Sequence, residues 1–456
     1  MRGITRAVGA AVTAVALAAG VAACGGGSDD GGKASTSGGT GALQKGSTVR
    51  LWIMPNGPHP QEDMEKAVAP FTAKTGVNVK VEVVGWDVQF DRIRNAAVSG
   101  EGPDITQAGT TQVPFFAALG GFEDLSDRVG DVGGASAYPD GVWKTTETQG
   151  RPGAWALPWF TEGRTIYYRT DVLKKAGVDP QTAFTDLTAF RSTLERIKAE
   201  VPDIEPFGAP GKKAFDLVHN VMPFVWDAGG AELSQDAKAS TINSPQSAEG
   251  VKFVTDLIKD GLFDKSQLER DGTQVENQFK GGKIAVFIGG PWTLQSVGRS
   301  DDTNWVPQAR KNVAVAPMPA GATGAFTFVG GSNLMLFKDS QVKDEAWALM
   351  KFLSQDQVQT QYADLLGMFP SRKEAQAKVG ASDANRRAFY EAIQQGRTYA
   401  PIPQWGQIEN AYKTRFGNIL DEAAQQGASF SDAEITKQLD AAAKEADALL
   451  AQGTGA

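Results

Sequence analysis

Apolar and polar positions alternate over residues 49–53 and again over 77–83, which predicts two short β-strands. Between them, apolar residues recur at helical spacing up to a glycine, which predicts a helix over 64–76. A second helical pattern covers 88–100, and Pro-Asp-Ile at 103–105 opens a third strand. This β-α-β-α-β order favours an α/β domain with a mostly parallel sheet.

The same alternation of elements continues along the chain. Strands are predicted at 165–168, 284–288, 313–316 and 333–337, and helices at 186–200, 247–260, 342–353 and 431–450. The sequence contains no repeat of about 20–50 residues, which would indicate a solenoid or propeller. The body of the chain therefore has the pattern of a large α/β protein.

The first 23 residues have the pattern of an export signal. Arg2 and Arg6 precede an apolar segment over 7–19, which is shorter than the roughly 20 residues that span a membrane. Two alanines then precede Cys24, the sole cysteine of the chain. This junction resembles a bacterial lipobox, in which the cysteine is lipidated and becomes the mature N-terminus. The alternative is an ordinary signal peptide beside a coincidental cysteine.

The segment after Cys24 is rich in Gly, Ser, Thr and Asp, so residues 24–46 are predicted to form a lipid-anchored flexible tether. The fold then begins at about Ser47. The remaining chain exceeds the length of about 250–300 residues at which single cores divide, so more than one domain is expected.

Composition excludes several classes of function. Removing residues 1–23 takes away two arginines and no acid, so the formal charge changes from −8 to −10, and no basic stripe suggests nucleic-acid binding. With one cysteine and two histidines, His59 and His219, the chain lacks the means for a disulfide, a cysteine metal site or a metalloprotease motif. We expect no cofactor and no metal.

Tryptophans suggest where a ligand binds. Five of the ten lie in Gly/Pro-rich segments near predicted strand ends: Trp86, Trp159, Trp226, Trp292 and Trp405. An aromatic ring covers the C–H face of a sugar, and a few planar polar groups pair with its hydroxyl rim. Ligands of open α/β sheets bind beyond the carboxyl ends of the strands, where these rings are expected.

Enzyme motifs are sparse. The chain has no Gly-x-Ser-x-Gly elbow, and the Gly-Ala-Pro-Gly-Lys-Lys loop at 208–213 lacks the spacing of a phosphate-binding loop. Carboxylates are plentiful, so a glycosidase that uses two acids stays open at this point.

An ordered series of motifs carries a family resemblance. The motifs are Leu51-Trp52, Gly102-Pro103-Asp104-Ile105, Gly109-Thr110-Thr111, Leu157-Pro158-Trp159, the segments 166–173 and 282–287, Gly290-Pro291-Trp292, and the segments 328–333, 367–372 and 401–405. From about Ser47 to its end the chain resembles the carbohydrate-binding extracellular solute-binding proteins of ABC importers, which include maltose-binding protein.

The resemblance implies a two-lobed α/β fold in which each lobe is a mostly parallel sheet flanked by helices, with the ligand in the cleft between them. Lobe one would comprise 47–158 plus 333–372, and lobe two 161–328 plus 373–456. The chain would cross between the lobes near 159–161, 328–332 and 370–373, where glycines suit a hinge.

The resemblance also implies ligand contacts. Trp292 and Trp405 match aromatic plates, Glu162 matches an acidic sugar contact, and Arg164 lies on the same side of the same predicted strand. The remaining expected contacts are Trp159, Trp226, Trp86, Asn56, His59, Thr110, Thr111, Gln112, Gly330, Gly331 and Ser332. The threonines and Gln112 stand where maltose-binding protein has an aromatic and an acid, which leaves the sugar's identity open. For His219, a buried structural role is favoured over a ligand contact.

The implied function is capture of a di- or oligosaccharide by closure of the cleft, without catalysis, for a membrane permease driven by a separate ATPase. The protein would be a monomer, exported and held by lipid, including palmitate, on the outer face of the bacterial cytoplasmic membrane. Two alternatives remain: a lipid-anchored glycosidase that uses Glu162 and another acid, and a solute-binding protein for a peptide, a polyamine or a metal. The scarcity of metal-ligating residues disfavours a metal.

Overall fold

The structure, a computed structural model, describes residues 42–57, 59–212, 214 and 216–452. The predicted signal peptide, Cys24 and most of the predicted tether lie outside these residues. The described residues, from 42 to 452, form one structural unit.

The last residues of the predicted tether already belong to the fold. Leu43 packs against a hydrophobic core, and the Gln44 N–H donates to the Glu345 carboxylate at 2.8 Å. The Gly46 N–H donates to the Gly76 carbonyl. The predicted boundary at 46 is therefore too late, because a run of polar and small residues does not reveal the single leucine that packs.

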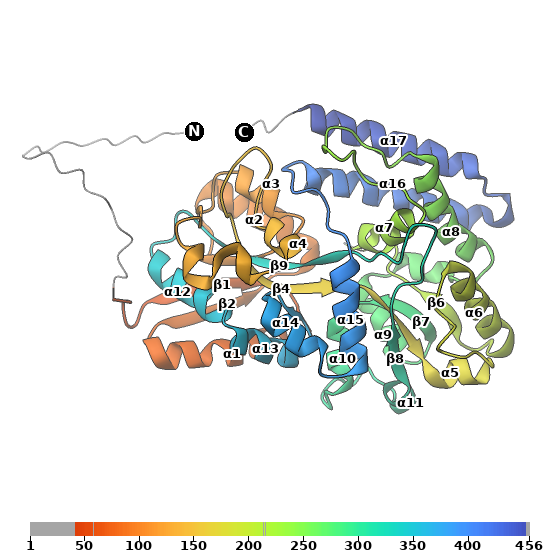
Figure 1. Cartoon of the computed structure of the whole chain (residues 1–456), viewed down its shortest axis with the longest axis horizontal. Helices are drawn as coiled ribbons and strands as arrows, with labels where there is room; N and C mark the ends of the chain where they lie inside the picture. The colour runs from red at the N-terminus through yellow and green to blue at the C-terminus, as the bar shows by residue number, and fades with distance from the viewer. Residues whose placement is uncertain (1–41, 58, 213, 215, 453–456) are drawn as a thin grey trace, which may run out of the picture. The chain divides into compact units, whose positions relative to one another are not determined.

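Six strands form one sheet in the spatial order β10-β4-β9-β3-β1-β2. They are β1 (Thr48–Ile53), β2 (Asn78–Val83), β3 (Ile105–Gly109), β4 (Leu157–Gly163), β9 (Val329–Leu336) and β10 (Phe369–Pro370). Figure 1 labels β1, β2, β4 and β9 of this sheet. β1 is parallel to β2 and β3, whereas the pairs β3–β9, β4–β9 and β4–β10 are antiparallel.

A second sheet has four strands in the order β6-β7-β5-β8. They are β5 (Thr165–Arg169), β6 (Glu205–Gly208), β7 (Ile284–Gly289) and β8 (Val313–Ala316). β6 and β7 are parallel, and β5 is antiparallel to both β7 and β8. Both sheets are thus mixed, which corrects the prediction of mostly parallel sheets.

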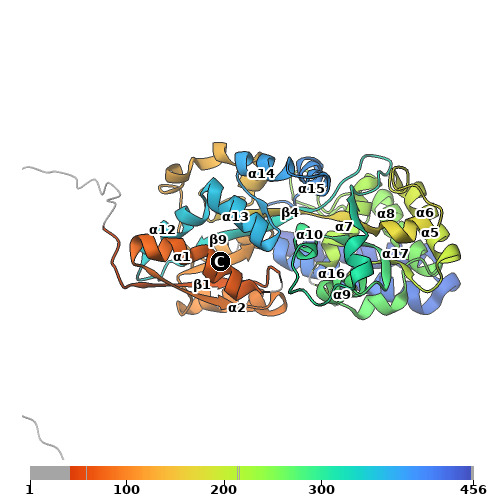
Figure 2. The ribbon, with the colours of Figure 1, turned by 90° about the horizontal axis from the view of Figure 1, so that it is seen from below.

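The antiparallel pairs have a topological cause. The chain leaves the first sheet along β4 and enters β5 of the second sheet directly, and it returns from β8 along β9. β4 and β9 therefore run in opposite directions and pair side by side, with Glu162 opposite Gly330 and Thr161 opposite Gly331. In Figure 2, β4 runs between the two groups of helices.

Helices cover both sheets. On or beside the first lie α1 (Pro60–Thr75), α2 (Trp86–Ser99), α3 (Val113–Ala118), α4 (Asp140–Lys144), α12 (Lys343–Leu353) and α13 (Asp356–Leu366). With the second lie α5 (Thr170–Lys175), α6 (Leu187–Glu200), α7 (Leu217–Asp227), α8 (Pro245–Lys259), α9 (Gly272–Lys280), α10 (Pro291–Val297), α11 (Pro307–Lys311), α16 (Trp405–Gln426) and α17 (Asp432–Ala451). α14 (Lys373–Gly380) contacts β10, and α15 (Ala384–Gln395) contacts both β4 and β5. Short 3₁₀ helices are η1 (Val129–Val132), η2 (Gly134–Ala137), η3 (Lys265–Glu269) and η4 (Gly427–Ser429).

Local signals explain why most predicted elements are confirmed. α1 begins with a proline, has acids in its first turn and ends at Gly76, which takes the left-handed conformation that favours glycine. α6 is capped by Asp186, whose side chain accepts from the Ala189 N–H. α7 was not predicted, because it is buried on all sides and lacks the one-sided apolar pattern of a surface helix.

Gly331 allows the two crossing strands to approach each other. Its φ is +130°, and a Cβ built there would lie 2.2 Å from the Phe160 carbonyl oxygen and 2.7 Å from the Thr161 Cα. Both the backbone conformation and the missing side chain are therefore required for β4 to pair with β9.

We predict that Gly331→Ala lowers the free energy of unfolding by about 1–3 kcal/mol or more, because alanine is strained at this φ and meets backbone atoms that have no room to move. Urea denaturation measures the change. The control is Gly141→Ala, at a position in α4 where a Cβ meets no atom within 4 Å. Equal stability of the two variants would contradict the requirement for glycine at 331.

Candidate ligand-binding cavity

A cavity of about 580 Å³ lies between the two sheets, within the size range of small-molecule sites. One wall follows the carboxyl ends of β1, β2 and β3, with residues 55–57, 85–87 and 109–111. The other wall includes Glu162 on β4, Arg164 just after it, and residues from α9 and α10. The cavity therefore lies where parallel strands end, as expected for open α/β sheets.

Trp292 is an aromatic wall of this cavity. α10 begins with Gly290 as N-cap and Pro291 as its first residue, and a Cβ at Gly290 would lie 2.0 Å from the Trp292 ring. The indole N–H donates to Glu276 Oε2 at 3.0 Å. The Arg164 guanidinium carbon lies 4.6 Å from the ring centroid, which is cation–π range. The ring is therefore held on three sides.

Arg164 stands between two carboxylates. Its Nη2 lies 3.5 Å from Glu162 Oε1 and 3.4 Å from Asp216 Oδ2, and its side chain is 6% exposed. Arg164 Nε and Glu162 Oε2 are buried without a hydrogen-bond partner. Burial raises the pKa of Glu162, partly offset by Arg164 and reinforced by Asp216. This charged group is incompletely satisfied.

Lys280 forms a second, tighter group. Its Nζ lies 2.7 Å from Glu276 Oε1 and 2.9 Å from Asp302 Oδ2. Burial acts to lower the pKa of Lys280, but the two carboxylates outweigh it and raise that pKa. Because Glu276 also accepts from the Trp292 indole, Lys280 fixes the carboxylate that orients the ring.

The opposite wall is organised by Gln107, a buried residue of β3. Its Oε1 accepts from the Met54 N–H at 2.9 Å and from Asn56 Nδ2 at 3.0 Å. Its Nε2 donates to Ser332 Oγ at 2.8 Å. Nearby, the Trp86 indole N–H donates to the Pro55 carbonyl at 3.2 Å. Gln107 thus fixes Asn56 and Ser332 from behind.

Nine of the predicted contact residues line the cavity: Asn56, Trp86, Thr110, Thr111, Glu162, Arg164, Trp292, Gly331 and Ser332. Three others lie close to it without lining it. His59 Nε2 lies 3.3 Å from Asp301, Gln112 Oε1 accepts from Gln89 at 2.9 Å, and Gly330 pairs with Glu162 in the sheet.

Trp159, Trp226 and Trp405 do not reach the cavity, which corrects the expectation that they are displayed to a ligand. Each is at most 2% exposed and belongs to a hydrophobic core. Trp405 stacks on Tyr399 with centroids 4.2 Å apart, and the Trp226 indole donates to Glu232. The Gly/Pro-rich context gave a wrong prediction here, because Trp405 is the first residue of the long helix α16 and lies on its buried face.

Sequence reasoning missed several residues of the cavity, namely Asp216, Asp271, Glu276, Lys280 and Asp302, and it missed Gln107, which holds Asn56. A local signal existed for Asp271, which caps α9 reciprocally with Gln274 in an Asp-x-x-Gln capping box. Glu276 and Lys280 lie one turn apart on that helix, so placing α9 at the cavity would have found them.

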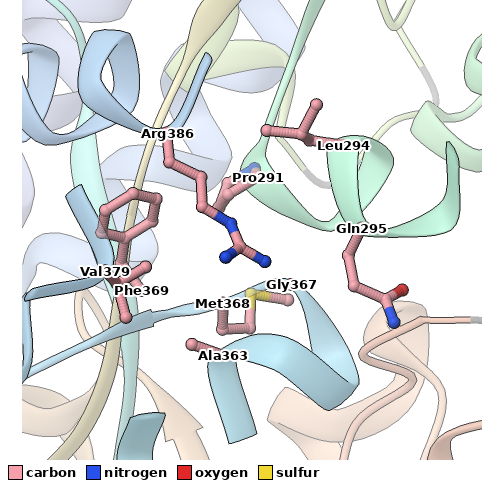
Figure 3. A pocket seen from close by; sticks show the side chains of 9 residues that line it. All are labelled: Pro291, Leu294, Gln295, Ala363, Gly367, Met368, Phe369, Val379 and Arg386. Carbon is pink, nitrogen blue, oxygen red and sulfur yellow. The ribbon is translucent and has the colours of Figure 1, made fainter. Parts of the chain in front are cut away.

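A second, much smaller cavity of about 10 Å³ lies beside α10, and Figure 3 shows the Arg386 guanidinium pointing toward Gly367 and Met368 there. It has room for about one water molecule, so it is too small to be the ligand site.

Among residues 42–452 as described, no cluster of three or more His, Cys, Asp or Glu side chains is placed to hold a metal ion. Across the same described part, no helix is long and apolar enough to span a membrane.

Known proteins resemble the chain along most of its length. The family model for bacterial extracellular solute-binding proteins matches residues 57–360. The diacetylchitobiose binding protein DasA of Streptomyces coelicolor is 27% identical over 405 residues, which cover 88% of this chain and 90% of DasA. A maltooligosaccharide ABC transporter solute-binding lipoprotein of Streptococcus pneumoniae is 22% identical over 80% of this chain and 81% of its own length.

Solved structures show the same fold. A solute-binding protein of Thermotoga lettingae bound to α-D-tagatose superposes with a TM-score of 0.78 at 24% identity, covering 89% of this chain and all of its own. The GacH receptor of Streptomyces glaucescens, known unliganded and with acarbose, gives 0.75 at 21% identity, with coverage of 88% and 99%. The predicted two-lobed α/β fold is thereby confirmed.

His219 lines the cavity and forms a buried pair with Glu409. The imidazole stacks on Phe328 with centroids 3.8 Å apart, and its Nε2 lies 3.3 Å from Glu409 Oε1. Thr111 donates to Glu409 Oε2 at 3.3 Å. Burial lowers the pKa of His219 well below its usual value and raises the pKa of Glu409 to about 8. Both groups are therefore predominantly uncharged at neutral pH.

We predict that Glu409 makes stability fall as pH rises from about 4.3, the usual glutamate pKa, to about 8. In this window the unfolded chain loses the proton that folded Glu409 retains, so the free energy of unfolding decreases. In Glu409→Gln, the free energy of unfolding, measured by denaturation at each pH, should change less with pH between these two values. Glu147→Gln, at an exposed position, is the control and should leave the profile unchanged. An unchanged slope in Glu409→Gln would contradict the assignment.

Proposed function

Because the chain belongs to the family of bacterial extracellular solute-binding proteins, we propose that it binds a carbohydrate in the 580 Å³ cavity and delivers it to an ABC importer. The observation that carries this proposal is the Trp292 ring beside the Arg164 group. An aromatic face next to planar polar groups suits a pyranose, whose C–H face and hydroxyl rim need both kinds of contact. The names of DasA and the maltooligosaccharide lipoprotein point to the same class of ligand.

The mechanism that we propose is closure of two lobes on the sugar. Lobe one comprises 47–158 plus 333–372, lobe two comprises 161–328 plus 373–456, and β4 and β9 connect them. Asn56 and Ser332 would bind from one lobe and Trp292 from the other. A ligand that contacts both walls favours the closed state by its differential affinity for it.

The size of the cavity favours a di- or oligosaccharide, and we propose that the protein acts as a monomer without catalysis.

The rival function is a glycosidase that uses Glu162 with Asp216, since burial raises the pKa of Glu162 as a general acid requires. Arg164 lies between the two carboxyl groups, however, and its positive charge opposes the rise in the Glu162 pKa that a general acid requires. Release of sugar fragments from an oligosaccharide panel would favour the enzyme.

We predict that Trp292→Ala weakens binding of the best sugar by about tenfold or more, because removing the ring exposes the sugar's apolar face to water. The sugar is first identified by thermal-shift screening of a panel, since a ligand that binds the folded state raises its melting temperature. Isothermal titration then compares the wild type and the variant.

Trp143→Ala is the matched control, because Trp143 packs beside a core and does not line the cavity. It should bind with wild-type affinity. Unchanged affinity in Trp292→Ala would remove this ring from the site, and stabilisation by an amino acid or peptide but by no sugar would overturn the carbohydrate proposal.

We also propose that the protein is exported and lipid-anchored at Cys24 on the outer face of the cytoplasmic membrane, with a diacylglycerol and an added acyl chain. Two or more acyl chains bind a membrane stably, whereas a single acyl chain binds reversibly.

We predict that Cys24→Ser abolishes incorporation of labelled palmitate in a bacterial host and moves the protein from the detergent phase to the aqueous phase. Labelling that persists in Cys24→Ser would exclude this anchor.

A further inference from the structure

The charges that line the cavity are strongly unbalanced. Six carboxylates line it, from Asp87, Glu162, Asp216, Asp271, Glu276 and Asp302, against two cations, Arg164 and Lys280. His219 also lines it, but burial lowers its pKa and keeps it neutral. The wall therefore carries an excess of negative charge toward any bound ligand.

Lys280 and Arg164 are each already paired with two carboxyl groups of the protein, so neither is a free partner for a ligand. Lys280 is bracketed by Glu276 at 2.7 Å and Asp302 at 2.9 Å, and Asp302 also accepts from Asn304. Arg164 is bracketed by Glu162 and Asp216 at 3.4–3.5 Å. Each cation thus faces two carboxyl groups, so an anionic ligand would find no free positive partner at either one.

Of the two groups, the one formed by Glu162, Arg164 and Asp216 contains polar atoms without hydrogen-bond partners. Its ion-pair distances are longer than those around Lys280, and Arg164 Nε and Glu162 Oε2 have no hydrogen-bond partner although both are buried. Buried polar atoms normally have partners, because an unmade hydrogen bond in the interior costs free energy. The open group lies against the Trp292 ring, where a sugar would stack.

The kind of polar group on the ligand decides how well it can pair with Glu162, Arg164 and Asp216. A hydroxyl supplies one donor and no charge, whereas a protonated amine supplies three donors and a positive charge beside two carboxyl groups that share one guanidinium. An amine on a sugar ring stacked on Trp292 would reach Glu162 and Asp216 while a neighbouring hydroxyl accepts from Arg164. Building on the proposed function, we propose that the ligand is an amino sugar, an oligosaccharide with at least one protonated amine at the Glu162–Arg164–Asp216 group.

The test uses three disaccharides of the same linkage that differ at one position: a free amine, its N-acetylated and thus uncharged form, and a carboxylate. Titration calorimetry is performed at a pH at which NMR of the free sugar shows the amine protonated. We expect the amine to bind about tenfold or more tightly than the uncharged form, and the carboxylate to bind weakest. Added salt should narrow the difference between the amine and the uncharged form.

Substitutions of Asp216 and Glu162 test whether the amine binds at these two side chains. Asp216→Asn and, independently, Glu162→Gln remove one charge each while keeping a polar side chain, and each should reduce the preference for the amine over its acetylated form by about tenfold. Asp203→Asn, an exposed acid of the second lobe that does not line the cavity, is the matched control and should retain the preference.

The outcomes distinguish the amino-sugar inference from the proposed function. Equal or tighter binding of the acetylated disaccharide overturns the amino-sugar inference and leaves the carbohydrate proposal intact. A preference for the amine that survives both Asp216→Asn and Glu162→Gln places the amine elsewhere and also overturns the inference. Failure of every sugar in the wider panel removes the proposed function itself.

Discussion

The antiparallel pairing of β4 and β9 is the constraint on which the rest of the structure depends. These two strands carry the chain out of the first sheet and back into it, and their register places Glu162 opposite Gly330. Gly331 allows this approach because no side chain separates it from Phe160. Glu162 and Ser332 lie on these strands, so the pairing that connects the sheets also sets where two cavity residues lie.

Charge arrangement determines what the cavity can accept. The positively charged side chains are used internally: Lys280 holds Glu276, which in turn orients Trp292, and Arg164 rests on the ring of Trp292. Ion pairs that are removed from water must compensate for the hydration that they lose. Here the tight group around Lys280 serves to position an aromatic ring, whereas the loose group around Arg164 is available to a ligand.

Sequence patterns predicted most strands but only six of the seventeen α-helices that the described residues form, namely those with a clear apolar period. They failed for α7, which is buried all round, and for strand direction, since a local pattern does not reveal that a strand returns from the other sheet. For the site, the resemblance led to Trp292, Glu162 and Arg164. It did not separate Trp292 from Trp405, because both follow prolines in turn-like segments and only tertiary packing buries the second.

Gln107 divides the cavity into two kinds of wall. Through hydrogen bonds to Met54, Asn56 and Ser332, it ties β3 to β9 and to the loop after β1, so that wall is held together by the sheet itself. The facing wall is built on side chains of the short helices α9 and α10 and on ion pairs. Substitutions there can change which ligand is accepted while the first wall stays intact. A protein built in this way can acquire a new specificity through one wall alone, while the hydrogen bonds around Gln107 are preserved.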